Sequence, residues 1–550
     1  MLRIPRVATA AALFASAAHP LSAAPRAEIR LDTAGIASLT YDGVELLFPG
    51  RPQVVVRRVE FEKPDGQVEK ADVKAPTVTT DAAAGRLTLQ YAWGSVRCAA
   101  QATAPHRVRL TVTIANDAAQ PMTAAEIQLL WFKFPRRPQG HPFDQKDGWR
   151  LGGDGKDAIP TVTFDYGDAW MVACSENGGI PLGFYVQIMP WESPNRDNSV
   201  SNLVMTTSPF RCAAEDTVIP PRQARTFAFS LRFGPRGTPP ASVLGDLFGA
   251  FGKANPPLLK WPDRRPIGML MHANSNTKYP KNPRGWFNDK DLDAVSEEGR
   301  ATFRERILAA ADQSIRVLKD MNAQGMILWD VEGEEFPHAT TYIGDPRMLP
   351  KLAPEMDAVA DAYFKRYHDA GLRTGICIRP SRVVLENGRA RHLHHGADTT
   401  FDEAEELIEK IALARKRWAC TLFYVDTNIH CFKTRDGKTT NRLLDAEVFR
   451  KTLQAHPGIL LIPEFAPLGY FAYGSSYREL RGGHAATPPE VRLAYPEAFS
   501  VIVVNDGPID ARRADLVDGV SRGDILMTRG WFADPANEKV KAIYAEAGKK

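Results

Sequence analysis

The sequence has none of the long apolar runs or charge tracts that would tie it to a membrane or to nucleic acid. Beyond the N-terminal stretch, no apolar run in the 550 residues reaches the roughly 20 residues that a transmembrane helix needs. Lysine and arginine number 69 and aspartate and glutamate 65, so the net charge is only +4, and no basic tract is present. We therefore expect no membrane span and no nucleic-acid partner.

Sequence motifs of several protein classes are also missing. The six cysteines contain no CxxC pair, and six in a chain of this length do not make a disulfide framework. We expect Cys377 and Cys420 to be core thiols, whereas a Cys98–Cys174 or a Cys174–Cys212 bridge stays open. No GxGxxG or phosphate loop opens a helix, so nucleotide cofactors are not expected. Ser475-Ser476 lies outside a GxSxG elbow, which disfavours an esterase.

The chain does begin with the features of a secretory signal. Arg3 and Arg6 precede the short apolar stretch Val7–Ala17, and Ser22-Ala23-Ala24 offers small residues for cleavage. We expect residues 1–25 to be a signal peptide that is cleaved near Ala24, and the mature protein to be periplasmic or secreted. Its 44% hydrophobic and 24% charged residues are typical of a soluble globular protein.

Residues 26–235 show a β pattern. Short alternating segments recur there, separated by Gly, Pro and Asp or Asn turns, and this spacing predicts an antiparallel β-sandwich. Residues 236–264 are rich in Pro and Gly and are predicted to be a linker. The expected strands are Ala27–Leu31, Val54–Phe61, Arg86–Trp93, Arg107–Ile114, Glu126–Phe134, Pro181–Met189 and Thr226–Phe233.

From residue 265 to residue 550 the pattern changes to strand, loop and helix. This alternation predicts a (β/α)8 TIM barrel. One of the eight strands has no clear apolar run, and we expect it between Leu468 and Tyr495. The other seven are Ile267–Met271, Met326–Trp329, Arg373–Ile378, Thr421–Val425, Gly458–Pro463, Ser500–Val504 and Asp524–Met527.

Polar side chains follow these strands at the end where a parallel barrel places its chemistry. Carboxylates beside flat apolar rings are what a sugar site needs. For any single strand-end Asp, the alternative is a cap on the next helix or turn. The candidates are His272, Asn274, Asp330, Glu332, Arg379, Asp426, Asn428, Glu464, Asn505 and Asp506, with Trp329 and Tyr470 as aromatic neighbours.

Several short motifs carry a family resemblance. They are Pro266-Ile267-Gly268, Trp329-Asp330, Gly371-Leu372-Arg373-Thr374-Gly375-Ile376, Phe423-Tyr424-Val425-Asp426 and Ile462-Pro463-Glu464. In their order, residues 265–510 resemble the α-galactosidase clan of retaining glycosidases. The last two motifs are more similar still to endo-α-N-acetylgalactosaminidase-type barrels. The N-terminal segment Leu31–Leu47 resembles the first hairpins of galactose-mutarotase-like sandwiches.

The resemblance implies roles for individual residues. Asp426, at the end of the fourth strand, would be the nucleophile, and Glu464, at the end of the fifth, the acid/base. In α-galactosidases proper the acid/base comes from the sixth strand, where we place Asn505-Asp506, so Asp506 is the alternative. Asp330 would bind sugar hydroxyls. The full set of expected substrate-binding residues is Asp330, Glu332, Arg379, Asn428, His272, Asn274, Trp329 and Tyr470.

The two roles agree with general chemistry. A retaining glycosidase needs an ionised carboxylate and a protonated one about 5–5.5 Å apart. Arg379 and Asn428 could keep Asp426 charged, while apolar flanks would raise the pKa of Glu464. We therefore predict an exported glycoside hydrolase. It would cleave α-linked galactose or N-acetylgalactosamine-like units of an oligo- or polysaccharide with retention, through a covalent glycosyl-enzyme.

Two other functions stay open. One is a non-catalytic carbohydrate-binding protein on the same scaffold. The other is a metal-assisted lyase or isomerase barrel, in which Asp330, Glu332 and a His would converge on one ion. No cofactor is expected. Glu332, Glu334 and Glu335 are a candidate structural Ca²⁺ site, with a solvated acidic loop as the alternative for the last two.

Overall fold

The computed structural model describes residues 26–549 with several gaps. The predicted signal peptide, Cys212, Glu334 and Glu335 lie outside the described residues. The gaps are residues 136–142, 145–158, 160, 166–168, 177–182, 189–197, 207–217, 236–237, 239–240, 275–278, 334–341, 434–438, 466 and 531–533.

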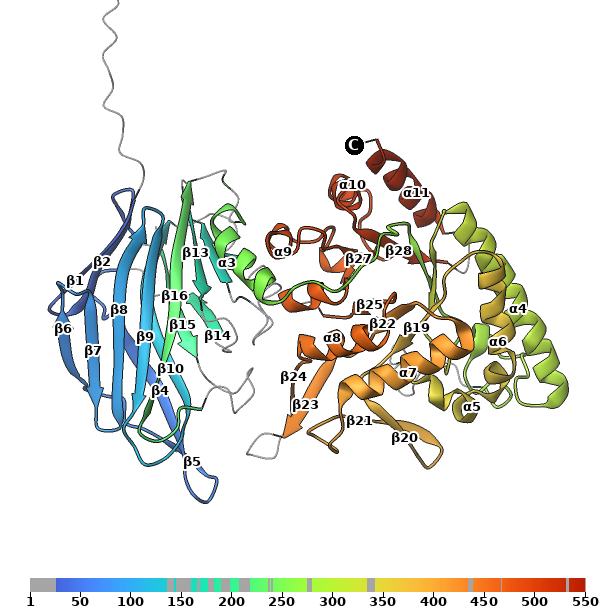
Figure 1. Cartoon of the computed structure of the whole chain (residues 1–550), viewed down its shortest axis with the longest axis horizontal. Coiled ribbons are helices and arrows are strands. Elements are labelled where there is room, and N and C mark those ends of the chain that lie inside the picture. Colours follow the sequence, from blue (N-terminus) through green and yellow to red (C-terminus); the bar gives the residue numbers. More distant parts are fainter. Residues whose placement is uncertain are drawn as a thin grey trace, which may run out of the picture.

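The first half of the chain forms antiparallel sheets (Figure 1). A small sheet contains β1 (Ala27–Asp32), β2 (Gly35–Tyr41) and β3 (Val44–Glu45). A second sheet has the order β14 (Gly183–Ile188), β15 (Asn198–Thr206), β10 (Met122–Pro135), β4 (Val55–Glu62) and β5 (Val68–Lys70). The third has the order β11 (Phe143–Asp144), β12 (Thr161–Asp165), β13 (Ala169–Ser175), β16 (Gln223–Pro235), β9 (Arg107–Asn116), β8 (Gly94–Ala104), β7 (Arg86–Tyr91) and β6 (Thr77–Asp81).

Strict alternation explains why these segments form sheets. In β9, Val108, Leu110, Val112 and Ile114 are fully buried and the residues between them are not, as expected of a strand with one face on the core. They share a core with Ile127 and neighbouring residues of β10. The predicted antiparallel β-rich domain is therefore confirmed, while its likeness to galactose-mutarotase-like sandwiches stays a prediction.

The cysteines that the structure describes are all buried free thiols. The core positions expected for Cys377 and Cys420 are thus confirmed, but a Cys98–Cys174 bridge is wrong. Cys98 packs in the core between the antiparallel sheets, whereas Cys174 packs in the larger core that includes the barrel helices. The two thiols therefore belong to different hydrophobic layers.

The second half forms a nearly closed barrel of eight parallel strands, as predicted. The strand absent from the sequence prediction is β26, within the interval expected for it. It is the sixth strand of the barrel, so Ser500–Val503 is the seventh. In chain order the strands are β17 (Ile267–Leu270), β18 (Gly325–Leu328), β19 (Gly375–Ile378), β22 (Leu422–Val425), β25 (Leu460–Pro463), β26 (Ser476–Glu479), β27 (Ser500–Val503) and β28 (Ile525–Arg529), with β25 and β26 at the two edges of the sheet.

Amphipathic helices surround the barrel. In α7 (Glu403–Trp418), the Asp402 side chain caps the first turn, acidic residues occupy that turn and basic residues the last turn, which suits the helix dipole. Among the described residues, no helix combines the length and apolarity needed to cross a bilayer. The other helices are α4 (Glu297–Asp320), α5 (Leu349–Leu352), α6 (Pro354–Asp369), α8 (Ala446–Ala455), α9 (Pro489–Ala494), α10 (Arg513–Ser521) and α11 (Pro535–Ala547), and two hairpins, β20 (Arg382–Glu386) with β21 (Arg389–Leu393) and β23 (Ile429–Lys433) with β24 (Thr439–Leu443), extend the loops after β19 and β22.

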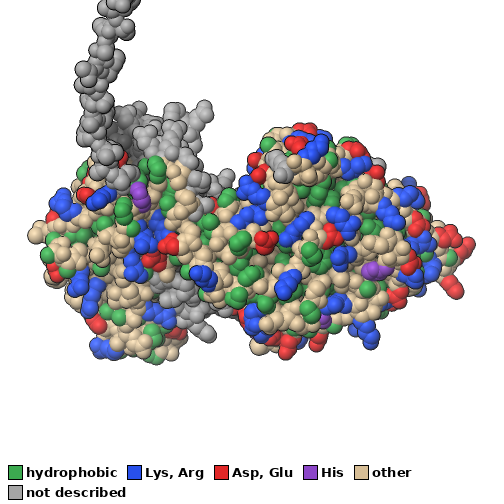
Figure 2. Space-filling view, turned by 45° about the horizontal axis from the view of Figure 1, so that its top comes forward, with side chains coloured by type: hydrophobic (Ala, Val, Ile, Leu, Met, Phe, Trp, Pro, Cys, Tyr) green, Lys and Arg blue, Asp and Glu red, His purple; other side chains and the backbone are tan. Residues whose placement is uncertain are grey.

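Helix α3 (Ala241–Ala254) lies between the two halves (Figure 1). Its Leu244 and Phe248 share a hydrophobic core with Trp170 of β13 and with Val491 of α9. Buried Arg232 of β16 donates a 2.8 Å hydrogen bond to the Val243 carbonyl. The helix is thus packed against both domains. On the face drawn in Figure 2, acidic and basic side chains are intermixed over both domains.

Candidate active site

The pleat of the barrel strands decides which strand-end residues face the interior. Successive residues of a strand point to opposite faces. Leu422 and Tyr424 belong to the cluster inside the barrel, and so do Leu460 and Ile462. Asp426 and Glu464 continue these two inward series at the C-terminal ends of their strands, which we call the mouth. By the same alternation, Asp330 continues the outward series of β18.

Asp426 and Glu464 are brought together at the mouth. Strands β22 and β25 are parallel neighbours, with Val425 opposite Pro463. The Thr427 backbone N–H donates to Glu464 Oε2 at 2.9 Å, and the Thr427 hydroxyl donates to Asp426 Oδ1 at 3.1 Å. One residue thus bridges both carboxyl groups. Thr427 has a φ of 48°, a left-handed conformation that is strained for a β-branched residue and is often found at functional sites.

Arg379 occupies the mouth beside Asp426. It continues the inward series of β19 after Cys377, and its Nε lies 3.8 Å from Asp426 Oδ2. Its Nη2 donates to the Thr427 hydroxyl at 2.8 Å and its Nη1 to the Tyr342 carbonyl at 3.0 Å. The Thr427 hydroxyl therefore accepts from the guanidinium and donates to the carboxylate. The expected position of Arg379 next to Asp426 agrees with this geometry.

Burial and mutual repulsion separate the two carboxyl groups electrostatically. Burial raises the pKa of Asp426, which is only 8% exposed, and the nearby Arg379 charge opposes that shift. Burial also raises the pKa of Glu464, and the Asp426 charge raises it further. When two adjacent carboxyl groups interact, one ionises first and the other retains its proton longer. Arg379 and Thr427 oppose the raised pKa at both groups, and Arg379 lies 3.8 Å from Asp426, so the arrangement is compatible with an ionised Asp426 beside a protonated Glu464.

The other residues expected near Asp426 support the mouth from below. Asn428 is fully buried, donates to the Tyr470 hydroxyl at 3.4 Å and accepts from the Phe465 N–H at 3.3 Å. The Tyr470 hydroxyl donates to the Leu444 carbonyl at 2.5 Å. Trp329 stacks on Tyr424 with 4.8 Å between ring centroids, inside the barrel. These side chains therefore position the mouth loops and do not present faces to solvent.

Asp330 and His272 are placed on the outer side of the barrel wall. Asp330 Oδ2 accepts the backbone N–H groups of His272 and Ala273 at 2.7 and 2.6 Å. The His272 ring bonds the Tyr363 hydroxyl of α6 at 2.8 Å, and burial lowers its pKa to about 4. Asp330 thus acts as a loop cap, the alternative that any strand-end Asp carries. The Asn274 backbone N–H donates to the Arg284 carbonyl at 3.0 Å.

Glu332 is buried without a hydrogen-bond partner among the described residues. Burial and the nearby Asp345 charge raise its pKa to about 8, against the opposing charge of Lys410. In the part of the chain that the structure describes, no three His, Cys, Asp or Glu side chains are placed to share a metal ion. The metal-assisted alternative gains no support from these residues.

The placement of Asp506 on the sixth strand is wrong, because Asp506 follows β27, the seventh. It is exposed, and Arg529 Nη2 donates to it at 2.7 Å. The sixth strand, β26, ends at Glu479, which the sequence analysis missed because Ser476–Glu479 contains no apolar run. Glu479 accepts two hydrogen bonds from Arg481 at 2.7 and 2.8 Å and one from Tyr477 at 3.1 Å. The Glu479 carboxylate is therefore occupied by donors from its own strand and from the turn that follows it.

No family model and no curated protein matches this chain. Solved structures with a similar arrangement include a cycloalternan-degrading enzyme from Trueperella pyogenes, with 10% identity, 96% of this chain and 80% of that chain covered, and a TM-score of 0.37. A Glycoside Hydrolase Family 97 enzyme from Pseudoalteromonas sp. strain K8 has 10% identity, coverages of 94% and 81%, and a TM-score of 0.38. An α-L-fucosidase GH29 from Bacteroides thetaiotaomicron has 11% identity, coverages of 56% and 73%, and a TM-score of 0.29. At such low values, function has to be argued from the site itself.

Proposed function

We propose that this chain is a retaining glycoside hydrolase that acts on α-linked sugars, with Asp426 as nucleophile and Glu464 as acid/base. The observation that carries the proposal is the meeting of these two carboxyl groups on Thr427 at the barrel mouth. Neighbouring strands supply them, Arg379 stands beside one, and the charge of that one raises the pKa of the other. A pair made of one ionised and one protonated carboxyl group is what acid-assisted cleavage of a glycosidic bond requires.

The proposed reaction has two steps. In the first, an Asp426 oxygen bonds to the anomeric carbon while the bond from that carbon to the leaving oxygen breaks, and Glu464 gives its proton to the leaving oxygen. In the second, Glu464 takes a proton from water, whose oxygen bonds to the anomeric carbon and displaces Asp426. Both residues return to their starting protonation states. The Arg379 charge stabilises the Asp426 carboxylate before it attacks the anomeric carbon and again after the sugar is released.

The identity of the sugar is the less constrained part of the proposal. The motif resemblance favours galacto-configured sugars, namely galactose or N-acetylgalactosamine. We propose that the enzyme is exported and removes these units from an oligo- or polysaccharide. Phe465 follows Glu464 directly and is 44% exposed, so its ring offers an apolar face of the kind on which sugars pack.

A screen with aryl α-glycosides of galactose, N-acetylgalactosamine, glucose and fucose tests the proposal. Wild type should release the aryl alcohol from at least one of them, with retained anomeric configuration in the first-formed product by ¹H NMR. Asp426→Asn should abolish turnover while it keeps the circular dichroism spectrum of the wild type. Turnover by that variant, or an inverted product, would refute the assigned nucleophile.

Azide rescue tests the acid/base separately. Glu464→Ala removes the proton donor, so azide should restore cleavage of substrates with good leaving groups and give a glycosyl azide. Glu479→Ala and Asp506→Ala are the matched controls from the next two strands. We expect rescue in Glu464→Ala alone, and rescue in either control would transfer the acid role to that strand.

A further inference from the structure

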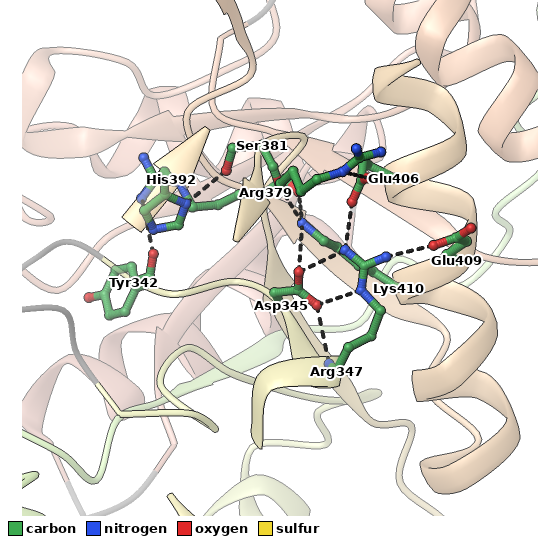
Figure 3. Close-up of polar contacts among 10 residues, drawn as sticks. Tyr342, Asp345, Arg347, Arg379, Ser381, His392, Glu406, Glu409 and Lys410 are labelled. Carbon is green, nitrogen blue, oxygen red and sulfur yellow. Dashed lines mark hydrogen bonds and ion pairs between the residues drawn. The ribbon is translucent and has the colours of Figure 1, made fainter. Parts of the chain in front are cut away.

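His392 contacts Arg379, the arginine that lies beside Asp426 (Figure 3). His392 lies in β21, in the hairpin that follows β19, and is half-buried. Its Nε2 is 3.2 Å from Arg379 Nη1, and its Nδ1 is 2.8 Å from the Ser381 hydroxyl. A continuous series of contacts therefore runs from His392 through Arg379 and Thr427 to Asp426.

The chemistry of the partners fixes the protonation state of this imidazole. A guanidinium carries five N–H donors and no acceptor, so His392 Nε2 has to be the acceptor of the Arg379 bond. The ring is then neutral, and its single proton is on Nδ1, directed at the Ser381 oxygen. A doubly protonated ring would turn an N–H toward the Arg379 N–H and place two cations in contact.

We infer that His392 is a positioning residue that acts through Arg379: the neutral ring holds the guanidinium beside Asp426, and the protonated ring releases it. The expected effect on activity rests on the proposed function, since Arg379 favours the ionised form that Asp426 needs for attack. The tautomer it requires can be measured without any substrate.

The surroundings restrict movement to the Arg379 side chain. The buried Lys410 ammonium donates to the backbone carbonyls of Arg379 and Ser381 at 2.8 and 2.6 Å, and Asp345 Oδ2 lies 3.5 Å from it (Figure 3). The backbone at this turn is therefore fixed from the helix side. Among the described residues, the Tyr342 carbonyl, the Thr427 hydroxyl and the His392 ring hold the guanidinium, and of these three groups the ring is the one that titrates in the physiological range.

In the part of the chain that the structure describes, Arg379 and Asp426 are charged groups near the imidazole, and they act on its protonation in opposite directions. Arg379, after β19, disfavours its protonation, and Asp426, after β22, favours it, because the His392 charge and the Asp426 charge stabilise each other. As the pH falls, protonation of His392 releases Arg379 from its place at the mouth, and protonation of Asp426 removes the nucleophile, so two titrating groups each lower the rate. The acidic limb of the pH–rate profile should therefore be steeper than the limb of one titrating group.

His392→Gln and His392→Phe separate this role from a merely structural one. The glutamine amide oxygen can accept the Arg379 bond but does not titrate, whereas phenylalanine fills the space without an acceptor. We expect His392→Gln to keep kcat/KM at pH 7 within about threefold of wild type, and its acidic limb to be shallower and shifted to lower pH. His392→Phe should lose about tenfold or more in kcat with little change in KM. A His392→Gln profile that superimposes on that of wild type would overturn the inference.

A spectroscopic readout keeps the inference testable if no substrate is found. In the full chain labelled with ¹⁵N-histidine, the His392 signals, assigned by their absence from His392→Gln, should show a neutral ring protonated on Nδ1 at pH 7. Asp426→Asn should move the titration of His392 to lower pH, because a stabilising negative charge is lost. A ring protonated on Nε2, or charged at pH 7, would refute the inference even if turnover and Asp426 dependence support the proposed function.

Discussion

Two buried aspartates at opposite ends of the barrel show how the same side chain serves two purposes. Asp426 follows β22 at the mouth, and Asp524 precedes β28 at the other end. Burial raises the pKa of both. Asp524 accepts from the Thr487 N–H at 2.8 Å, the Thr487 hydroxyl at 2.5 Å, the Ser500 N–H at 2.9 Å and Arg492 at 3.3 Å. Asp426 accepts from the Thr427 hydroxyl and faces Arg379 at 3.8 Å.

The difference shows that a raised pKa alone does not mark a reactive group. The Asp524 carboxylate accepts hydrogen bonds from three segments of the chain and thereby links them. Its role is therefore to stabilise the fold. Asp426 has fewer donors, and a second carboxyl group stands beside it. In barrels of this type, residues at the C-terminal strand ends serve chemistry and those at the other end serve stability.

Exchanging each aspartate for asparagine should separate the two roles completely, and this is the largest effect we expect. Asp426→Asn should lower kcat by at least about 10³-fold, since an amide is not a nucleophile. Asp524→Asn should keep kcat near that of wild type but lower the free energy of unfolding by about 1–3 kcal/mol, because its NH2 group would face a backbone N–H. Activity assays and thermal melts of both variants check this. Equal loss of activity in both variants would contradict the assignment of catalysis to the mouth and of stability to the opposite end of the barrel.

The pH dependence of stability should sharpen the same contrast. A carboxyl group whose pKa is raised in the folded state favours the fold below its unfolded pKa, and this contribution is lost as the pH rises through its folded pKa. Once ionised, the desolvated Asp426 carboxylate therefore weakens the fold. Asp426→Asn should melt at the same or a higher temperature than wild type at pH 7, and the gap should close below about pH 4. A variant that melts lower at pH 7 would contradict the pKa direction.

Replacing Arg379 should produce the next largest effect on activity. Arg379→Met removes the charge that opposes desolvation of Asp426, so the pKa of Asp426 should rise further. The acidic limb of kcat/KM should move to higher pH, and activity at pH 7 should fall by about 10–100-fold. Arg382→Met is a matched control, because Arg382 pairs with Glu406 outside the mouth. An unshifted limb in Arg379→Met would place Asp426 outside the influence of Arg379.

Removal of the Thr427 hydroxyl should lower the activity less than removal of the Arg379 charge. Thr427→Val keeps the shape but loses the oxygen between Arg379 and Asp426, whereas Thr427→Ser keeps the oxygen. We expect about a tenfold loss of kcat in the first and a loss within about threefold in the second. Equal kinetics for the two variants would mean that the hydroxyl bridge has no role in the reaction.

The alternation of strands and helices was enough to predict the barrel and the polar residues at its mouth. It was not enough to say which side of the wall a strand-end residue faces. Both faces of a parallel strand are apolar, so Asp330 and Asp426 look alike in sequence. The position of each residue in the pleat of its strand decides that Asp330 lies outside the barrel and Asp426 inside it. Glu479 was missed because β26 has no apolar run. The contact of His392 with Arg379 could not be predicted, because it comes from a hairpin inserted after β19.

The smallest effect should come from Asp506, the alternative acid. It is an exposed residue paired with Arg529 at 2.7 Å, and such surface pairs contribute about 0–1 kcal/mol. Asp506→Asn should therefore leave the melting temperature nearly unchanged and kcat within about twofold of wild type. The decisive measurement is the dependence of kcat on the leaving group. Loss of the acid should penalise poor leaving groups far more than good ones, and we expect this for Glu464→Gln but not for Asp506→Asn. A steep dependence in Asp506→Asn would mean that the seventh strand, not the fifth, delivers the proton.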